Sequence, residues 1–405
     1  MKEKPGFWGG LIVGLLIALS ILFLILFGES IHNMLLGRGF NSGNSAILTS
    51  EVKQKIDLIN DYIDYYYLDY QDDDVSGETP EERAEGMYKG LVDSLNDKYS
   101  EYYSPKEYSR VHETQKGSFE GIGVTIVEND QGLFEVAGFT SDDSSAKASG
   151  VQEGDIFYQV DGQDAVGIDI SALVDMVRGR EGTSVNIIFL RGEYMDKVEL
   201  TIPRKKVETK TVSHNMLENK VGHIMIGSFE EITVEQFESA LSDLKEQGME
   251  KLILDLRGNG GGMVDVAVKI TDDLIGTGVV TYTLDKQGER KDYNAVTPVE
   301  LGLPMVVLVD SGSASASELV TGALKDHGAA KVVGTTTYGK GIVQNLYPLT
   351  DGSAIKLTNA RYYTPSGVNI QGTGIEPDVV IEFDPEAYKK NGRDNQLEKA
   401  KELLK

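Results

Sequence analysis

Residues 306–326 read VVLVDSGSASASELVTGALKD: an apolar run, a turn of small residues, and a segment of helical length. This pattern predicts a buried strand, a tight turn and a helix. Such a turn exposes a serine hydroxyl beside the N–H groups of a helix start, as in hydrolase nucleophile elbows. Ser315 and Glu318 also fit the S-x-x-E capping box, which requires no catalysis. The residues themselves leave four candidate nucleophiles open: Ser311, Ser313, Ser315 and Ser317.

Apolar strand patterns and helical patterns alternate on both sides of this stretch, from residue 206 onward. Their order predicts an α/β region with a mostly parallel sheet and helices on its faces. Residues 118–203 instead carry short strands separated by turns, a compact β-rich module of PDZ size. Residues 48–106 carry a helical pattern with Ile56, Ile59 and Ile63 on one stripe.

A second glycine-rich turn follows the strand pattern at 252–262, LILDLRGNGGG. Four glycines in five residues expose consecutive backbone N–H groups, which can form an anion-binding nest. A flexible turn is the alternative, although glycine runs lose much conformational entropy on folding.

Residues 334–344, GTTTYGKGIVQ, match most of a Walker A loop. A phosphate loop requires a hydroxyl after the lysine and then a helix. Gly341 stands in the hydroxyl position, and the β-branched residues and Pro348 that follow predict a strand. The motif therefore does not predict nucleotide binding.

Lys340 has features expected of a lysine that acts as a base. No Asp or Glu occurs from His327 to Thr350, so the neighbouring sequence supplies no carboxylate. Burial lowers the pKa of a lysine, and a base near neutral pH needs a shift of ~3 units, or ~4 kcal/mol. The alternative is a surface lysine in a flexible glycine loop.

Composition excludes several classes of function. The 405 residues include 39 basic and 64 acidic side chains, a net charge of -25, which argues against nucleic acid as a partner. The absence of cysteine excludes disulfides and thiolate chemistry. No H-E-x-x-H motif occurs, and the sequence predicts neither a metal site nor a cofactor.

The N-terminal region predicts a membrane anchor. Residues 7–27 carry no charge and are long enough to span a bilayer, with Lys2 and Lys4 before them and Glu29 after. By the positive-inside rule, this arrangement predicts a single-pass protein of the cell membrane with its catalytic part on the extracellular side. A cleaved signal peptide is the alternative, but the run is long for one and no A-x-A site follows.

Together these stretches closely resemble the carboxyl-terminal processing, or tail-specific, proteases, a family of serine peptidases with a Ser–Lys dyad. The matching motifs are DLRGNGGG (255–262), SASASE (313–318), GALKDHG (322–328) and GTTTYGKGIVQ (334–344), and the resemblance covers roughly residues 50–405. It implies an α/β fold with a ClpP/crotonase-like protease core, a β-rich PDZ domain and a helical N-terminal region. It also implies a serine endopeptidase that cleaves extracytoplasmic proteins through an acyl-enzyme.

The family pattern assigns roles to residues of this chain. It implies Ser315 as nucleophile, Lys340 as general base and Gln344 as the residue that orients the lysine. The implied oxyanion hole is the N–H of Ala316 with that of Gly261 or, as a near-equal choice, Gly260. Asp326 matches a family position that we interpret as structural support. None of the five histidines lies in a recognisable motif, so a Ser–His–Asp triad is the weaker alternative.

The module in front resembles a PDZ domain. Its GIGV run resembles the loop that binds a peptide C-terminus, which implies recognition by Gly121, Ile122, Gly123 and Val124. The RGREG run at 178–182 offers Arg178 or Arg180 as a residue coupling this module to the protease.

The predicted organisation runs through seven segments: a cytoplasmic tail (1–6), anchor (7–28), linker (29–47), helical region (48–106), PDZ domain (107–205), protease core (206–380) and C-terminal segment (381–405). The predicted partners are protein or peptide substrates with exposed C-termini and the membrane, but not nucleic acid. The helices at 48–95 and 394–405 could form a homodimer, which the sequence neither predicts nor excludes. Two further alternatives are a PDZ scaffold on an inactive core and a crotonase-like acyl-transfer enzyme acting on a thioester.

Overall fold

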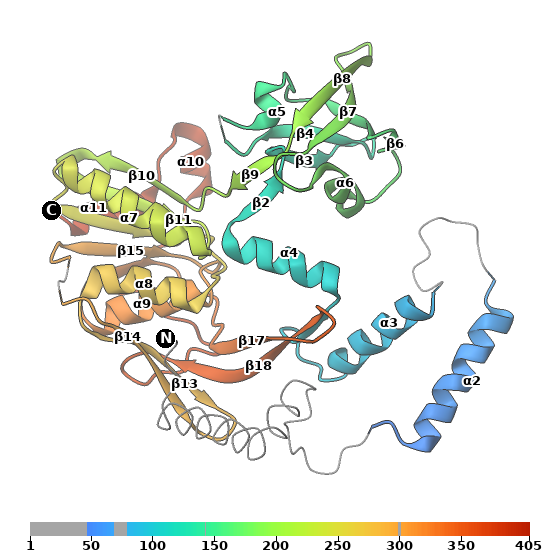
Figure 1. The fold of residues 1–405 in the computed structure, drawn as a ribbon. Coiled ribbons are helices and arrows are strands. Elements are labelled where there is room, and N and C mark those ends of the chain that lie inside the picture. Colours follow the sequence, from blue (N-terminus) through green and yellow to red (C-terminus); the bar gives the residue numbers. More distant parts are fainter. Residues whose placement is uncertain (1–46, 69–78, 142, 299–300) are drawn as a thin grey trace, which may run out of the picture. The chain divides into compact units, whose positions relative to one another are not determined.

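The computed structural model describes residues 47–68, 79–141, 143–298 and 301–405. The chain divides into two compact units, and Figure 1 labels most of their elements. One unit comprises the described residues up to Tyr108 together with Leu346–Leu357. The other comprises Ser109–Asn345 and Thr358–Lys405.

The centre of the larger unit is a six-stranded sheet in the order β10-β11-β12-β15-β16-β19. These strands are Val212–Leu217, Val221–Ile226, Lys251–Asp255, Met305–Val309, Ala330–Gly334 and Val379–Val380. β10 is antiparallel to β11, and the remaining pairings are parallel. Strands covered on both faces need continuous apolar runs, and every residue of β15 is buried. The predicted mostly parallel sheet is confirmed for these strands.

Helices lie on both faces of this sheet. They are α7 (Glu231–Glu246), α8 (Val264–Ile275) and α9 (Ala316–Asp326) on one face, and α11 (Asn395–Leu403) on the other. Leu254 and Val307 point into the core shared with α7, α8 and α9, whereas their neighbours Ile253 and Val306 face α11. The alternation follows from the two-residue period of a strand. The larger unit also contains the short α10 (Pro385–Asn391) and the 3-10 turn η1 (Glu218–Lys220).

A second sheet is antiparallel. It has five strands: β1 (Glu101–Tyr103), β13 (Gly278–Asp285), β14 (Arg290–Ala295), β17 (Ile342–Pro348) and β18 (Ala354–Tyr363). β13 pairs with β14 and with the end of β18. β13 and β18 both lie in the region from residue 206 onward, for which the alternating strand and helix patterns predicted a mostly parallel sheet, and for these two segments that prediction was wrong. Apolar patterning identifies a strand but not its partner, which depends on register between distant segments. β17 confirms that a strand, not a helix, follows Lys340.

The β-rich region forms its own core. Its elements are β2 (Ser118–Gly121), β3 (Val124–Glu128), β4 (Phe134–Phe139), α5 (Ser145–Ala148), β5 (Ile156–Val160), β6 (Gln163–Asp164), α6 (Ile170–Val177), β7 (Ser184–Arg191), β8 (Asp196–Pro203) and β9 (Lys205–Glu208). The order of the main sheet is β3-β4-β5-β7-β8, and β2 pairs with β9 in a separate ribbon. Phe157 and Phe189 are fully buried with ring centroids 4.9 Å apart, at the centre of this core.

The smaller unit confirms that the predicted helical region at 48–106 contains helices. Its elements are α2 (Ser50–Tyr66), α3 (Pro80–Asp93), β1 (Glu101–Tyr103) and the start of α4 (Pro105–Lys116). Thr79 and Glu82 form a reciprocal capping box at the start of α3. The apolar stripe of α2 is not buried: no residue of this helix is buried among the described residues.

The predicted membrane span, residues 7–27, lies outside the described residues. In the ranges that the structure describes, no helix is long and apolar enough to cross a bilayer. The longest of them, α2, has 17 residues, and a span needs about 20. The predicted localisation, a single-pass protein of the cell membrane with its catalytic part outside, is corrected accordingly because the structure does not support it.

Candidate active site

The turn between β15 and α9 holds Ser315 in a conformation that L-residues rarely adopt. Its φ and ψ are +52° and −112°, outside the regions that a residue with a Cβ prefers. A backbone of this kind costs about 1–3 kcal/mol and persists only where the surroundings enforce it. The strand-to-helix turn predicted from the small residues is present, but Ser315 is buried in it, whereas the pattern predicted an exposed serine.

The other serines of the turn either donate their hydroxyls to backbone carbonyl groups or lie exposed at the surface. Ser313 Oγ donates to the Leu256 carbonyl at 2.7 Å, and Ser317 Oγ donates to the Asn259 carbonyl at 2.9 Å. Both serines are fully buried. Their hydroxyls tie the turn to the glycine loop at 258–262 and to the residue two positions before it. Ser311 lies exposed at the surface.

The glycine loop lies directly against the Ser315 turn. A Cβ on Gly261, where φ is +105°, would lie 2.7 Å from the Ala314 carbonyl oxygen and 3.0 Å from the Ala316 nitrogen. Only glycine permits this approach. The Gly261 N–H donates to Asn259 Oδ1 at 2.8 Å. Within the part of the chain that the structure describes, no acceptor is hydrogen-bonded to the N–H groups of Gly260 and Ala316.

Glu318 joins the serine turn to the lysine loop. Its side chain is fully buried, and its carboxylate accepts four hydrogen bonds. Oε2 accepts from the backbone N–H of Ser315 and of Lys340, each at 2.9 Å. Oε1 accepts from Thr337 Oγ1 at 2.6 Å and from the Gly339 N–H at 2.8 Å. The predicted capping role is therefore only part of what Glu318 does.

The predicted capping box is present at the start of α9. The Ser315 N–H donates to Glu318 Oε2, and the Glu318 N–H also donates to the Ser315 carbonyl oxygen at 2.9 Å. These bonds tie Ser315 to the first turn of α9.

Lys340 lies half-buried in the loop that precedes β17. Gln344, four residues later on β17, donates from Nε2 to Thr358 Oγ1 of β18 at 3.2 Å. Asp326, which we interpreted as support, accepts from the Ser366 N–H at 2.8 Å and so fixes the segment after β18. The glycines beside Lys340 are needed, since a Cβ on Gly341 would lie 2.5 Å from the Gln371 nitrogen.

Tyr362 is a neighbour of Ser315 that no motif indicated. Burial raises the pKa of this tyrosine, and a side-chain hydrogen bond with Ser315 acts in the opposite direction. Its N–H donates to the Gly341 carbonyl at 2.9 Å, so it also contacts the lysine loop. Sequence patterns offered little signal for Tyr362, because it is one of two adjacent tyrosines at the end of a strand.

The predicted C-terminus-binding loop lies between β2 and β3. Gly123 has φ +77°, and a Cβ there would lie 3.0 Å from both Ser144 Oγ and Thr140 Oγ1. Ser144 Oγ donates to the Gly123 carbonyl at 2.8 Å and also to that of Ile122, at 3.0 Å. These bonds fix the loop carbonyls on the side of α5.

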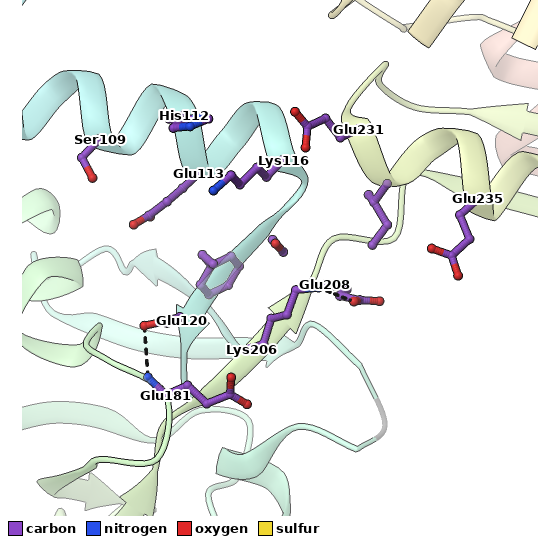
Figure 2. Close-up of a pocket in the computed structure, with 13 residues that line it drawn as sticks. Ser109, His112, Glu113, Lys116, Glu120, Glu181, Lys206, Glu208, Glu231 and Glu235 are labelled. Carbon is purple, nitrogen blue, oxygen red and sulfur yellow. Dashed lines mark hydrogen bonds and ion pairs between the residues drawn. The ribbon is translucent and has the colours of Figure 1, made fainter. Parts of the chain in front are cut away.

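A cavity of about 690 Å³ lies among α4, β2, β9 and α7, and none of the predicted site residues lines it. Figure 2 shows its charged lining, where Glu120 accepts the Glu181 N–H and Lys206 pairs with Glu208. Six glutamates and two lysines line it: Glu113, Glu120, Glu181, Glu208, Glu231, Glu235, Lys116 and Lys206. The excess of carboxylates opposes binding of an anionic peptide terminus here.

Comparison with known protein families matches residues 220–381 to peptidase family S41. A probable CtpA-like serine protease of Staphylococcus haemolyticus is 35% identical over 82% of this chain and 66% of its own length. The carboxy-terminal processing protease CtpA of Bacillus subtilis is 32% identical over 85% of this chain and 73% of its own length. The chain spans slightly less than two thirds of the staphylococcal relatives, 66% and 65%.

Among solved structures, the photosystem II D1 C-terminal processing protease is 26% identical, with a TM-score of 0.47. The match covers 82% of this chain and 87% of that protein. A putative S41 protease from Bacteroides fragilis is 17% identical over 83% of this chain and 92% of that protein, with a TM-score of 0.49.

The substitution Glu318→Gln tests the role of this buried carboxylate. Glu318→Gln places an NH₂ group opposite donors and removes the charge, so at least one N–H loses its acceptor. We expect the free energy of unfolding to fall by about 3 kcal/mol. We expect any hydrolytic kcat to fall roughly 100-fold, because the serine turn and the lysine loop lose their common acceptor. Chemical denaturation and peptide hydrolysis measure the two effects.

Asp272→Asn is the matched control. Asp272 is also a buried carboxylate, and it accepts from the N–H groups of Val296 and Thr297 and from Thr297 Oγ1, away from Ser315. This variant should lose stability but keep its kcat below the unfolding temperature. Equal loss of kcat in both variants would show that Glu318 acts only through stability.

Proposed function

We propose that this chain, which belongs to peptidase family S41 and to its carboxy-terminal processing proteases, is a serine endopeptidase that uses Ser315 and Lys340. The observation that carries the proposal is the Glu318 carboxylate, which receives the N–H of both residues on one oxygen. A single buried atom thus holds the proposed nucleophile and base in a fixed relation. The strained backbone of Ser315 supports the same assignment.

The proposed reaction begins with neutral Lys340, which takes the Ser315 proton as Oγ attacks the scissile carbonyl. The carbonyl oxygen becomes an oxyanion, which the N–H groups of Ala316 and Gly260 or Gly261 stabilise. The open donors at Ala316 and Gly260 favour this pair, because the Gly261 N–H already donates to Asn259. Lys340 then protonates the leaving amine, and water hydrolyses the acyl-enzyme.

Gln344 is proposed to orient the lysine. Its amide nitrogen donates to Thr358, so we assign its amide oxygen to the ammonium or amine of Lys340. Tyr362 stays neutral because burial raises its pKa, and it is proposed to hold the Ser315 hydroxyl before attack.

The central test uses Ser315→Ala, Lys340→Ala and Lys340→Arg with an unstructured peptide as substrate. Each should lower kcat by roughly 10⁴-fold or more, because the nucleophile or its base is lost. The arginine variant keeps the positive charge but cannot release a proton, so it should be as inactive as the alanine variant. Rates of peptide cleavage under saturating substrate measure the effect.

Lys331→Ala removes an exposed lysine of β16 and serves as the control with wild-type activity. A Ser315→Ala protein that cleaves as fast as wild type would exclude the proposal. Binding of peptides without cleavage by the wild type would support the scaffold alternative. Turnover of an acyl thioester but not of peptides would support the acyl-transfer alternative.

We further propose that residues 107–205 form a PDZ domain and 206–380 a ClpP/crotonase-like core, followed by the segment 381–405. The proposed PDZ domain recognises the substrate C-terminus at Gly121–Val124. The support is the positive φ and the crowding of Gly123, which shape a turn that a side chain would fill. The substrates would be proteins or peptides with exposed C-termini.

C-terminal amidation of the peptide substrate tests this recognition. The amide lacks the charge that backbone N–H groups would bind, so its KM should exceed that of the free acid about 10-fold at equal kcat. Gly123→Ala should raise the KM of the free acid to that of the amide. Gly132→Ala is the control, since Gly132 also has positive φ but its nearest neighbour would be a Glu128 oxygen at 3.6 Å. Equal KM for acid and amide in the wild type would contradict the proposal.

We also propose that two copies of the chain associate through α2 and α3. Leu58, Ile59 and Tyr62 on α2, and Met87 and Leu91 on α3, are each exposed by 49% or more. Large apolar side chains gathered on two helices are typical of an interface. The other helix considered, α11, buries Ala400 against the sheet of its own chain.

Light scattering tests this association. Leu58→Asp combined with Leu91→Asp should convert a dimer to a monomer, because charges cannot be buried unpaired in the interface. Tyr194→Asp alters a more exposed residue, on the turn between β7 and β8 and outside α2 and α3, and should leave the dimer intact. A wild type that has the monomer mass at all concentrations would contradict the proposal.

A further inference from the structure

The glycine loop at 258–262 has few means of fixing its own position. Four of its five residues lack side chains, so its anchors come from outside. Asp310 Oδ1 accepts the Gly258 N–H at 2.9 Å, and Asn259 Nδ2 donates to the Ile226 carbonyl. The Asn259 carbonyl accepts from Ser317 Oγ and the Ala314 N–H, and the Gly261 carbonyl accepts from the Phe229 N–H. A further anchor is Arg257, which immediately precedes the loop.

Arg257 is held on two sides. Toward the sheet, its Nε and Nη2 donate to the two carboxylate oxygens of Asp255 at 2.9 and 2.6 Å. Toward the C-terminal helix, its Nη1 donates to Asp394 Oδ1 at 3.1 Å and to Gln396 Oε1 at 3.0 Å. A planar guanidinium with both edges occupied has little freedom to rotate.

The side chains in these contacts are largely buried, so water weakens their electrostatic attraction only in part. Asp255 is 1% exposed, and burial disfavours its charge, but hydrogen bonds from His223 and Arg257 outweigh burial and lower its pKa. The side chains of Arg257 and Asp394 are each 15% exposed, so water screens the pair only in part.

The C-terminal helix is itself a fixed support. Asp394 caps α11 by accepting the Leu397 N–H at 2.9 Å, and the buried Gln396 donates to the Ile381 carbonyl at 2.8 Å. The far end of α11 packs Ala400 and Leu404 against the parallel sheet.

We infer that Asp394 and Gln396, at the start of the C-terminal helix, are positioning residues that hold the Gly258–Gly262 loop through Arg257. Neither touches the reacting atoms. They set where the loop N–H groups lie relative to Ser315, so their loss weakens oxyanion stabilisation without altering peptide binding. The catalytic part of this inference rests on the proposed function, whereas the positioning part does not.

The test compares Asp394→Asn with Asp384→Asn. Asparagine also caps helices well, so the first variant keeps α11 but loses the charge that faces Arg257. Asp384 caps the neighbouring α10 through the Ala387 N–H and is the matched control. Amide hydrogen exchange of residues 258–262 and steady-state peptide cleavage are measured on the full chain.

In Asp394→Asn, we expect exchange in the loop to accelerate about 10-fold. We expect kcat to fall about 10-fold with KM within about twofold of wild type. Asp384→Asn should leave all three quantities unchanged. Gln396→Met, which keeps the side-chain length, should accelerate loop exchange in the same direction.

Loop exchange in Asp394→Asn equal to that of Asp384→Asn would overturn the inference, and cleavage by the wild type would then leave the proposed function intact. Faster loop exchange in a protein that cleaves no peptide would support the positioning and exclude the proposed function. A rise in KM with constant kcat would overturn the catalytic part.

Discussion

The buried carboxylate of Glu318 is the contact on which the candidate site depends. A charged carboxylate away from water is costly unless hydrogen bonds replace its hydration. Here three backbone N–H groups and one hydroxyl do so, and two of the N–H groups belong to Ser315 and Lys340. Satisfying the carboxylate therefore fixes the turn after β15 and the loop before β17 together. Charge-assisted bonds of this kind are stronger than neutral ones.

The glycine loop is held to the same turn by a different set of bonds. Ser313 and Ser317 donate to carbonyl groups of residues 256 and 259, and the Ala314 N–H donates to the Asn259 carbonyl. The small residues of the turn are needed because these backbones lie in van der Waals contact. Strain at Ser315 is tolerated because so many bonds around it are made. The sheet supplies the rigid base from which both turns emerge.

Local structure was predictable from the sequence wherever a short pattern determines it. The apolar run at 306–309 and the helix after Ser315 were predicted and are present. The strand after Lys340 followed from its β-branched residues and Pro348. Glu318 was interpreted only as a cap, because the S-x-x-E pattern explains it locally. Its full burial was the missing information, and burial depends on segments that are distant in sequence.

The sequence alone determined the family, the serine turn, the lysine loop and the glycine loop, because each is a run of a few residues with its own chemistry. The tertiary structure distinguished Ser315 from its neighbours. The hydroxyls of Ser313 and Ser317 donate to backbone carbonyl groups more than fifty residues away in the sequence. It also brought the N–H groups of Ser315 and Lys340 to one carboxylate, and it brought Arg257 into hydrogen-bond contact with Asp394, which is 137 residues away in the sequence. Those contacts depend on the path of the folded chain, which no local pattern specifies.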